Sequence, residues 1–253
     1  MPTVTSADGT PIAYDRAGAG PALVLVDGAM CYRAAGPMPP LAARLQEHFT
    51  VYTYDRRGRG ESGDTLPYDP ARETEDLLAL VGAAGGSAAV YTMSSGGAIG
   101  LAAAAASPAV TALALYEPPF VGNDPAYSAR LAELLAAGRR GDAVALFMGR
   151  VGMPAEAIAG FRASPGFATL EAIAHTLAYD DAVLGAGHVR PEVAAAIRVP
   201  STVIGGGASP AFLLDAARAT AAALPGARFE VVDGQTHDPD PDALAPVLVK
   251  LLS

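Results

Sequence analysis

The sequence has no tryptophan, a single cysteine and no run of eighteen or more apolar residues. With Cys31 as its one cysteine, the chain cannot form an internal disulfide. Without a long apolar run, it is expected to have no transmembrane helix. Residues 1–8 lack a basic segment followed by an apolar stretch, so we expect no signal peptide. These absences together favour a soluble cytoplasmic protein.

Basic residues are also scarce. The 253 residues include 17 lysines and arginines against 26 aspartates and glutamates, which gives a net charge of −9. Nucleic acids and anionic membranes bind to a basic face, and the densest basic stretch here, residues 56–59, has acidic residues at both ends. We therefore expect a small-molecule substrate, with no nucleic acid and no membrane as partner. The oligomeric state stays open.

The sequence does contain a regular alternation of strand-like and helix-like segments, with 51% apolar residues available for a core. Alternation of this kind predicts right-handed crossovers and a mostly parallel α/β sheet flanked by helices. The run 22–26 has no polar alternation, which is typical of a strand covered on both faces. We predict strands over 12–14, 22–26, 49–54, 87–91, 110–116, 201–204 and 228–232, and helices over 41–48, 73–84, 96–106, 211–224 and 243–252.

The middle of the chain breaks this alternation. Residues 121–199 contain helical patterns only, over 127–137, 142–151, 155–162, 168–178 and 191–197. We predict a core formed by residues 1–120 and 200–253, with a helical cap, 121–199, inserted after the strand 110–116. Such an insertion covers the edge where open parallel sheets bind ligands, so we interpret it as shaping a substrate pocket. A second helical layer without a role in selectivity is the alternative.

The most informative segment is Val90–Gly97, where a strand passes through a serine turn into an alanine-rich helix. A serine on such a turn has an exposed hydroxyl, and the next backbone N–H groups point at an oxygen that gains charge during acyl transfer. The pattern G-x-S-x-G is imperfect here, because Thr92 replaces the first glycine before Ser94. With Ser95 as nucleophile the bulky Met93 would fill that position, so we favour Ser94. An ordinary helix N-cap is the alternative interpretation.

Four features in this order resemble the α/β-hydrolase superfamily, in particular serine esterases and lactonases with a helical cap. They are the small-residue loop 27–30 after a strand, the segment 54–62, the Ser94 turn, and the loop 233–237 before the last helix. The resemblance covers nearly the whole chain. Its most specific part is the motif D-x-R-G-x-G-x-S, which the family uses structurally and which is met by Asp55, Arg57, Gly58, Gly60 and Ser62.

The resemblance implies a role for individual residues. Ser94 matches the nucleophile and His237 the general base, since an imidazole can take the serine proton and return it to the leaving group. The backbone N–H groups of Ala29 and Ser95 would form the oxyanion hole. Relatives carry His-Gly before Ala29, whereas this chain has Asp27, whose carboxylate would need a partner such as Arg33 or a backbone amide if buried. Tuning or repelling substrates is the other role open to it. The remaining histidines, His48, His175 and His188, are weaker candidates.

The acid of the triad departs from the common pattern. Relatives most often place an aspartate after the seventh strand of the family fold, which corresponds to 201–204 here, and this chain has Ser209 at that position. Some relatives place the acid after the sixth strand of the family fold, which corresponds to 110–116 here, and Glu117 directly follows it. Because triads are defined by geometry, we predict Glu117 as the residue that orients His237, with a structural salt bridge or a strand-end cap as the alternative. Asp124 is an outside candidate.

The expected function is a cofactor-free serine hydrolase that acts on a small ester or lactone through an acyl-enzyme. No Cys/His spacing suggests zinc and no G-x-G-x-x-G opens a helix after the first strand, so no metal or dinucleotide cofactor is expected. The alternatives are a perhydrolase with the same triad, or a non-hydrolytic lyase, cyclase or ligand-binding protein on the same fold. The altered elbow, Asp27 and the missing seventh-strand acid keep the non-hydrolytic class open. The substrate itself cannot be derived from the sequence.

Overall fold

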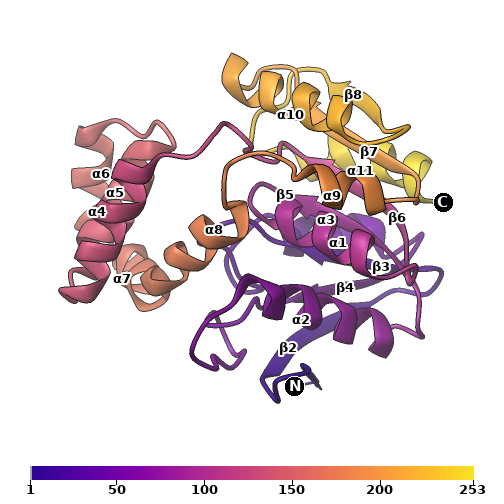
Figure 1. Cartoon of the computed structure of the whole chain (residues 1–253), viewed down its shortest axis with the longest axis horizontal. Coiled ribbons are helices and arrows are strands. Elements are labelled where there is room, and N and C mark those ends of the chain that lie inside the picture. The colour runs from indigo at the N-terminus through magenta and orange to yellow at the C-terminus, as the bar shows by residue number, and fades with distance from the viewer. Residues whose placement is uncertain (1) are drawn as a thin grey trace.

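Eight strands form one sheet in a computed structural model that describes residues 2–253 (Figure 1). The order across the sheet is β1-β2-β4-β3-β5-β6-β7-β8, and every pair from β4 to β8 is parallel, while β1 and β2 add an antiparallel edge. The predicted, mostly parallel sheet is thereby confirmed. The strands are β1 (Thr3–Thr5), β2 (Pro11–Ala17), β3 (Ala22–Val26), β4 (Thr50–Tyr54), β5 (Ala88–Met93), β6 (Val110–Tyr116), β7 (Ser201–Gly206) and β8 (Arg228–Val232).

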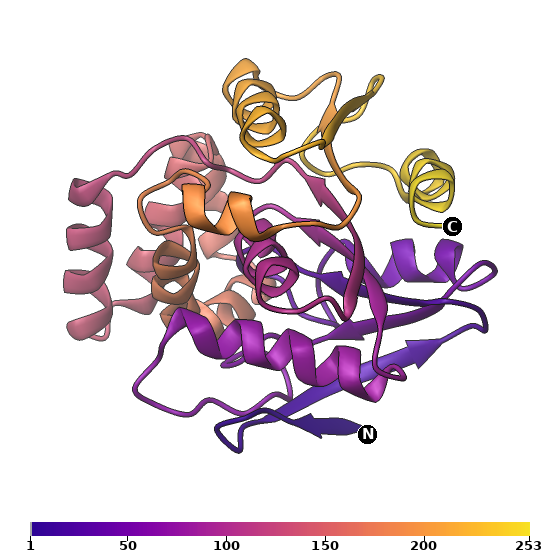
Figure 2. The ribbon, with the colours of Figure 1, turned by 45° about the vertical axis from the view of Figure 1, so that its right-hand side comes forward.

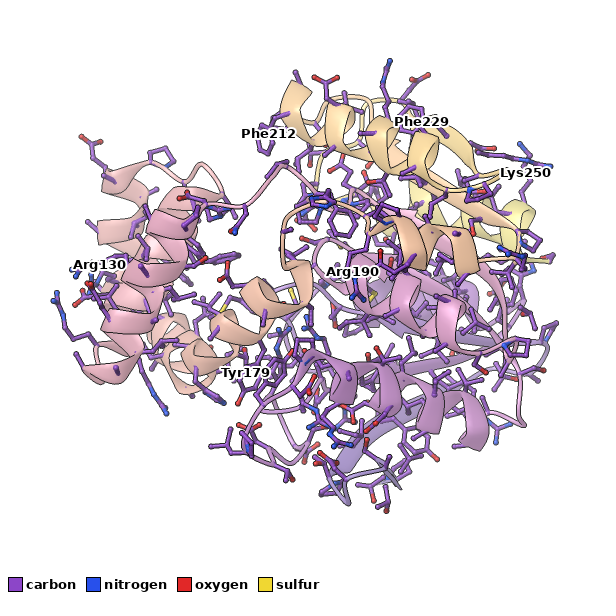
Figure 3. All side chains as sticks on the ribbon, viewed as in Figure 1. Arg130, Tyr179, Arg190, Phe212, Phe229 and Lys250 are labelled. Carbon is purple, nitrogen blue, oxygen red and sulfur yellow. The ribbon has the colours of Figure 1, made fainter. Side chains whose placement is uncertain are left out.

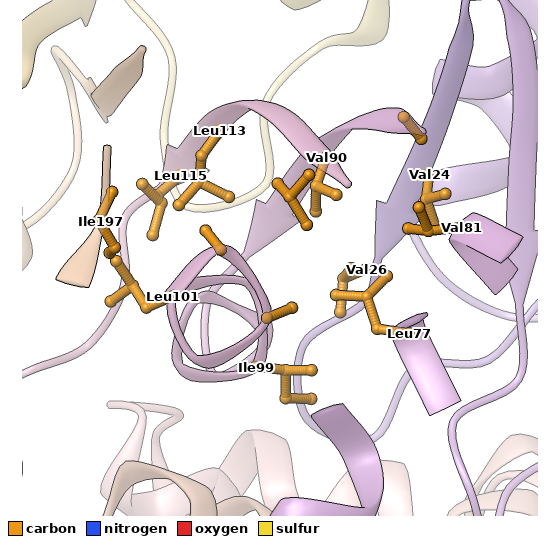
Figure 4. Close-up of a cluster of buried hydrophobic side chains, with 14 of the residues drawn as sticks. Val24, Val26, Leu77, Val81, Val90, Ile99, Leu101, Leu113, Leu115 and Ile197 are labelled. Atoms are coloured by element: carbon orange, nitrogen blue, oxygen red, sulfur yellow. The ribbon is translucent and has the colours of Figure 1, made fainter. Parts of the chain in front are cut away.

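Helices cover both faces of the sheet, because successive side chains of its strands point to opposite sides. In β3, Val24 and Val26 join one buried apolar cluster, whereas Leu23 and Leu25 join the other. The first cluster packs under α2 (Pro70–Ala83), α3 (Gly96–Ala106), α9 (Pro191–Ala196) and α10 (Ala211–Ala223), as the close-up in Figure 4 shows in part. The second lies under α1 (Met38–Leu45) and α11 (Pro241–Leu252). The uninterrupted apolar run of β3 is explained by this double cover.

A helical cap is inserted between β6 and β7 and forms a separate lobe beside the sheet (Figures 1 and 2). It has an apolar cluster of its own, which Met30 from the loop after β3 also joins. The cap therefore packs on the small-residue loop that the sequence singles out. Its elements are α4 (Pro125–Ala136), α5 (Arg140–Arg150), α6 (Ala155–Arg162), α7 (Pro165–Ile173), the 3₁₀ turn η1 (Ala174–Thr176) and α8 (Leu177–Leu184).

The cap differs from the sequence prediction in two places. The single helix predicted over 168–178 is wrong, since α7 ends at Ile173 and α8 continues to Leu184 after the turn η1. The helix α9 lies inside the range predicted as cap, but Ala194 and Ile197 pack in the core cluster under the sheet. Helical periodicity shows that an apolar face exists, and it does not say which neighbour covers that face. No helix among residues 2–253 is long and apolar enough to cross a bilayer.

The D-x-R-G-x-G-x-S segment joins the edge of the sheet to its neighbours. The Asp55 carboxylate accepts hydrogen bonds from the backbone N–H groups of Arg33 and Glu61, at 2.7 and 2.9 Å. The buried Arg57 forms a bidentate pair with Asp76 on α2 at 2.7 and 2.8 Å. The Ser62 hydroxyl bonds the backbone of β2. The three polar side chains of the motif, those of Asp55, Arg57 and Ser62, thus form hydrogen bonds inside the protein, which fits a structural role.

Candidate active site

Ser94 stands on a strained turn between β5 and α3. Its φ of 54° lies in the left-handed region, which a residue with a β-carbon adopts at a cost of roughly 1–3 kcal/mol. Two backbone bonds hold it there: the Ser94 N–H donates to the carbonyl of Tyr116 at 3.0 Å, and the Gly97 N–H donates to the carbonyl of Ser94 at 2.9 Å. The side chain is half-buried. A nucleophile elbow requires a strained strand-to-helix turn of this kind.

The neighbouring Ser95 has a different environment. Its φ of −58° is helical, and it occupies the N-cap position of α3. Its buried hydroxyl donates to Asp180 on the cap helix α8 at 2.7 Å. The hydroxyl of Ser95 is therefore engaged in a structural bond, while Ser94 carries the turn. This arrangement favours Ser94 over Ser95 as the reactive residue.

Thr92 fits at the position where the pattern has glycine, because the residue that faces it on α3 is itself a glycine, Gly100. Thr92 is fully buried, and a β-carbon built on Gly100 of α3 would lie only 2.5 Å from the Thr92 Cγ2 methyl. A glycine on either β5 or α3 removes one β-carbon from the contact, so the strand and the helix can approach each other closely in both cases. On the opposite side of the turn, a β-carbon on Gly28 would lie 2.8 Å from the Ser94 β-carbon. The loop after β3 thus lies directly against Ser94.

Glu117 and His237, predicted as triad partners, are joined by a short hydrogen bond. Glu117 Oε2 lies 2.7 Å from His237 Nδ1, and Glu117 Oε1 accepts from the Gly206 N–H at 2.7 Å. Glu117 is fully buried, and its φ of 43° turns it away from the course of β6. Burial by itself raises the pKa of Glu117, but the bonds from His237 and the Gly206 amide outweigh it, so the pKa lies below its ordinary value. A buried carboxylate that stays ionised fixes the imidazole ring.

The chain surrounding this pair is held by further bonds. The Tyr116 hydroxyl donates to the carbonyl of Thr236 at 2.6 Å, one residue before His237. The Ala208 N–H donates to the carbonyl of Gln235 at 2.8 Å. Ser209, at the position where relatives most often carry the acid, faces the Glu117 carboxylate without the geometry of a regular hydrogen bond. Tyr116 therefore supports both Ser94 and the His237 loop, although no hydrogen bond joins Ser94 to His237 within residues 2–253.

Asp27 is the unusual residue of the loop that carries Ala29. Its side chain is buried, and its Oδ1 has no hydrogen-bond partner among residues 2–253. Burial raises the pKa of Asp27 to about 7, against the opposing effect of the positive charges of Arg59 and Arg56. The partner suggested from the sequence, Arg33, forms ion pairs with Asp15, Asp55 and Glu61. Asp27 thus places a buried carboxyl group, one oxygen of which has no hydrogen-bond partner among residues 2–253, in the candidate oxyanion loop.

A buried ionic cluster beneath the site escaped the sequence interpretation. Asp180 of α8 binds Arg56 and Arg59, at 2.7 and 2.6 Å, and Arg56 also binds Glu73 of α2. A signal was present in the sequence: Asp180 stands three residues after Leu177 and four before Leu184, on the apolar stripe of its helix. An acid on such a stripe indicates a buried partner.

The other candidates lie elsewhere. His175 in η1 pairs with Asp64 at 3.2 Å, His48 is exposed, and the His188 ring lies 3.2 Å from the carbonyl of Ala186. Asp124 caps α4 and pairs with Arg150. Within the described part of the chain, residues 2–253, no three His, Cys, Asp or Glu side chains are grouped so that they could hold a metal ion.

Comparison with known proteins gives a consistent result. A model of the alpha/beta hydrolase family matches residues 9–247. An alpha/beta hydrolase from Sphaerobacter thermophilus DSM 20745 is 49% identical, with a TM-score of 0.90 over 99% of both chains. The enol-lactonase from Burkholderia xenovorans LB400 is 26% identical, with a TM-score of 0.75 over 99% of both chains. A hydrolase from Pseudomonas aeruginosa PA01 is 25% identical, with a TM-score of 0.77 over 99% of this chain and 97% of its own. No curated sequence matches the chain.

Proposed function

Because the chain belongs to the alpha/beta hydrolase family, we propose that it is a serine hydrolase that cleaves a small ester or lactone through an acyl-enzyme. The observation that carries the proposal is the 2.7 Å bond between His237 Nδ1 and the buried carboxylate of Glu117. A histidine fixed through Nδ1 presents its other ring nitrogen, Nε2, as a base. The similarity to an enol-lactonase at 26% identity supports a cyclic or simple ester as substrate.

In this reaction Nε2 of His237 takes the proton of the Ser94 hydroxyl as Ser94 attacks the substrate carbonyl. The carbonyl oxygen becomes an anion, which the N–H groups of Ala29 and Ser95 stabilise. His237 then gives the proton to the leaving oxygen, and an acyl-Ser94 ester remains. For a lactone the leaving alcohol or enol remains part of the acyl chain, and deacylation releases a single hydroxy or keto acid.

Deacylation uses the same groups in reverse. His237 removes a proton from a water molecule, the resulting hydroxide attacks the acyl carbon, and Ser94 leaves with the proton. Glu117 remains ionised throughout and stabilises the imidazolium that forms in both halves of the cycle. Hydrogen bonds hold the backbone of Ser94 on both sides, so little backbone reorganisation is needed during attack.

The test is covalent labelling with a fluorophosphonate, followed by peptide mass spectrometry. The proposal expects stoichiometric modification of Ser94 in the wild-type protein and none in Ser94→Ala, together with turnover of p-nitrophenyl acetate or a small lactone. Ser95→Ala is the comparison, because it removes the adjacent hydroxyl but not Ser94, so covalent modification of Ser94 should persist even if the rate of labelling falls. Labelling that survives in Ser94→Ala would contradict Ser94 as the nucleophile. Ligand binding without turnover that Ser94→Ala leaves unchanged would favour the non-hydrolytic alternative.

A further inference from the structure

The two segments that carry the candidate oxyanion donors are bound to one buried carboxylate from the cap. Asp180 Oδ1 accepts from the Ser95 hydroxyl and from Arg56 Nη1, each at 2.7 Å, and Asp180 Oδ2 accepts from Arg59 Nη2 at 2.6 Å. Ser95 belongs to the elbow side of the site. The two arginines lead to the opposite side.

Both arginines bind backbone carbonyls of the loop 27–31. Arg59 Nη1 donates to the carbonyl of Gly28 at 2.5 Å and to that of Cys31 at 3.2 Å. Arg56 Nη1 makes longer contacts with the carbonyls of Asp27 and Gly28, at 3.4 and 3.5 Å. Ala29 lies between these carbonyls, so the orientation of its N–H follows from how they are held.

The network closes only when the cap is docked. Asp180 lies on α8, and its neighbour Tyr179 stacks on Tyr68 of the core with ring centroids 3.7 Å apart, at the junction between α8 and the core (Figure 3). Arg56 has a second carboxylate, Glu73, at 2.7 Å. Arg59 is 1% exposed, and Asp180 is its single ion-pair partner within residues 2–253. A displaced α8 would leave the Arg59 charge buried and unpaired, at considerable cost.

We propose that Asp180 is a positioning residue, which holds the loop of Ala29 and the turn of Ser95 in a fixed position relative to each other. Docking of the cap then assembles the oxyanion hole. This inference rests on the proposed function for the identity of the two donors. It does not require Asp180 to touch substrate. The carboxylate acts through Ser95, Arg56 and Arg59, so its loss affects the position of two N–H groups together.

The first arm of the test is kinetic and uses full-length Asp180→Asn, with Asp181→Asn as the matched control. Asp181 is the next residue of α8, and its side chain forms no ion pair within the described residues, 2–253. Displacement of oxyanion donors by a fraction of an ångström lowers kcat about 10- to 100-fold. We expect that loss in Asp180→Asn with a KM within about threefold of wild type, which marks an interaction made in the transition state.

The second arm does not depend on hydrolysis. Amide ¹H–¹⁵N shifts and hydrogen exchange are recorded for Ala29 and Ser95, with the amides of β3 and β5 as internal references. We expect both amides to shift and to exchange at least about tenfold faster in Asp180→Asn, while Asp181→Asn leaves them unchanged. If Asp180→Asn does not fold, Ser95→Ala replaces it in this experiment, because it keeps the ion pairs of Asp180 with Arg56 and Arg59. We then expect a larger change in the amide shift of Ser95 than in that of Ala29.

The outcomes are separable. If fluorophosphonate fails to label wild-type Ser94, the proposed hydrolysis is wrong, and the amide data still decide whether Asp180 holds the two segments. If labelling succeeds but the Ala29 and Ser95 amides and kcat are unchanged in Asp180→Asn, the positioning role is wrong. A fall in melting temperature with equal changes at every amide would reduce Asp180 to a general structural residue, and it would also overturn the inference.

Discussion

The side-chain methyl of Thr92 occupies the space that a β-carbon on Gly100 would need, at a separation of 2.5 Å. The two residues face each other across the contact between β5 and α3, Thr92 two residues before Ser94 and Gly100 six residues after it. This pair explains how the elbow forms without its usual first glycine. It also makes Gly100 a position where a single methyl group is expected to be costly.

We expect Gly100→Ala to destabilise the protein by about 1–3 kcal/mol, because overpacking between buried backbone segments forces them apart. Urea denaturation measures the loss. Gly82→Ala is the control, since a β-carbon there meets nothing within 4 Å and alanine is the better helix former, so stability should rise by up to about 1 kcal/mol. Thr92→Ala should restore most of the stability of Gly100→Ala. Equal effects of the two glycine substitutions would contradict this account of the elbow.

Replacing Glu117 by glutamine should lower kcat by about 10²- to 10⁴-fold with little change in KM. The glutamine amide can donate toward Nδ1, which favours the wrong tautomer of His237, and it carries no charge to stabilise imidazolium. Ester turnover between pH 6 and 9 provides the measurement. Asp233→Asn is a matched control, because Asp233 is exposed and four residues before His237. A Glu117→Gln enzyme with wild-type kcat would assign the orienting role to another group.

Asp27 should make stability depend on pH. Its pKa is raised from 3.8 to about 7 in the folded protein, so the native state retains a proton that the unfolded state loses between these values. Stability therefore falls as the pH rises from about 4 to about 7, by about 4 kcal/mol in total at 1.4 kcal/mol per pH unit. Asp27→Asn cannot ionise and should flatten this dependence. Melting temperatures at pH 5 and pH 8 test the prediction, and parallel curves for the two proteins would refute it.

Arg57 should matter for stability rather than for chemistry. Its removal leaves the buried Asp76 without its cation, so Arg57→Ala is expected to cost about 3–5 kcal/mol. The exposed pair of Arg130 and Glu133 offers the comparison, and Arg130→Ala should cost less than about 1 kcal/mol. Denaturant unfolding reports both values. The kcat of the folded fraction of Arg57→Ala should stay near that of wild type, and a selective loss of kcat would point to a direct role in the site.

The architecture could be predicted from the amino-acid sequence, because the information that specifies it is local and periodic. The unbroken apolar run of β3 indicates a doubly covered strand, and the alternation of strands and helices fixes a parallel sheet. The strand-turn-helix context selected Ser94, and the position of Glu117 after β6 placed its carboxylate at the edge where His237 arrives. Glu117 and His237 are 120 positions apart, yet the order of the elements restricts them to one edge of the sheet.

The way in which distant side chains compensate one another depends on the folded arrangement and has no local signal in the sequence. That Gly100 makes room for Thr92, that α9 packs with the core, and that Asp180 binds Arg56, Arg59 and Ser95 all depend on which faces meet. Periodicity identifies a buried face or a buried charge, but the partner is set by packing between elements far apart in the chain. For the same reason the burial of Asp27, with its Oδ1 lacking a hydrogen-bond partner among residues 2–253, is a property of the folded protein alone.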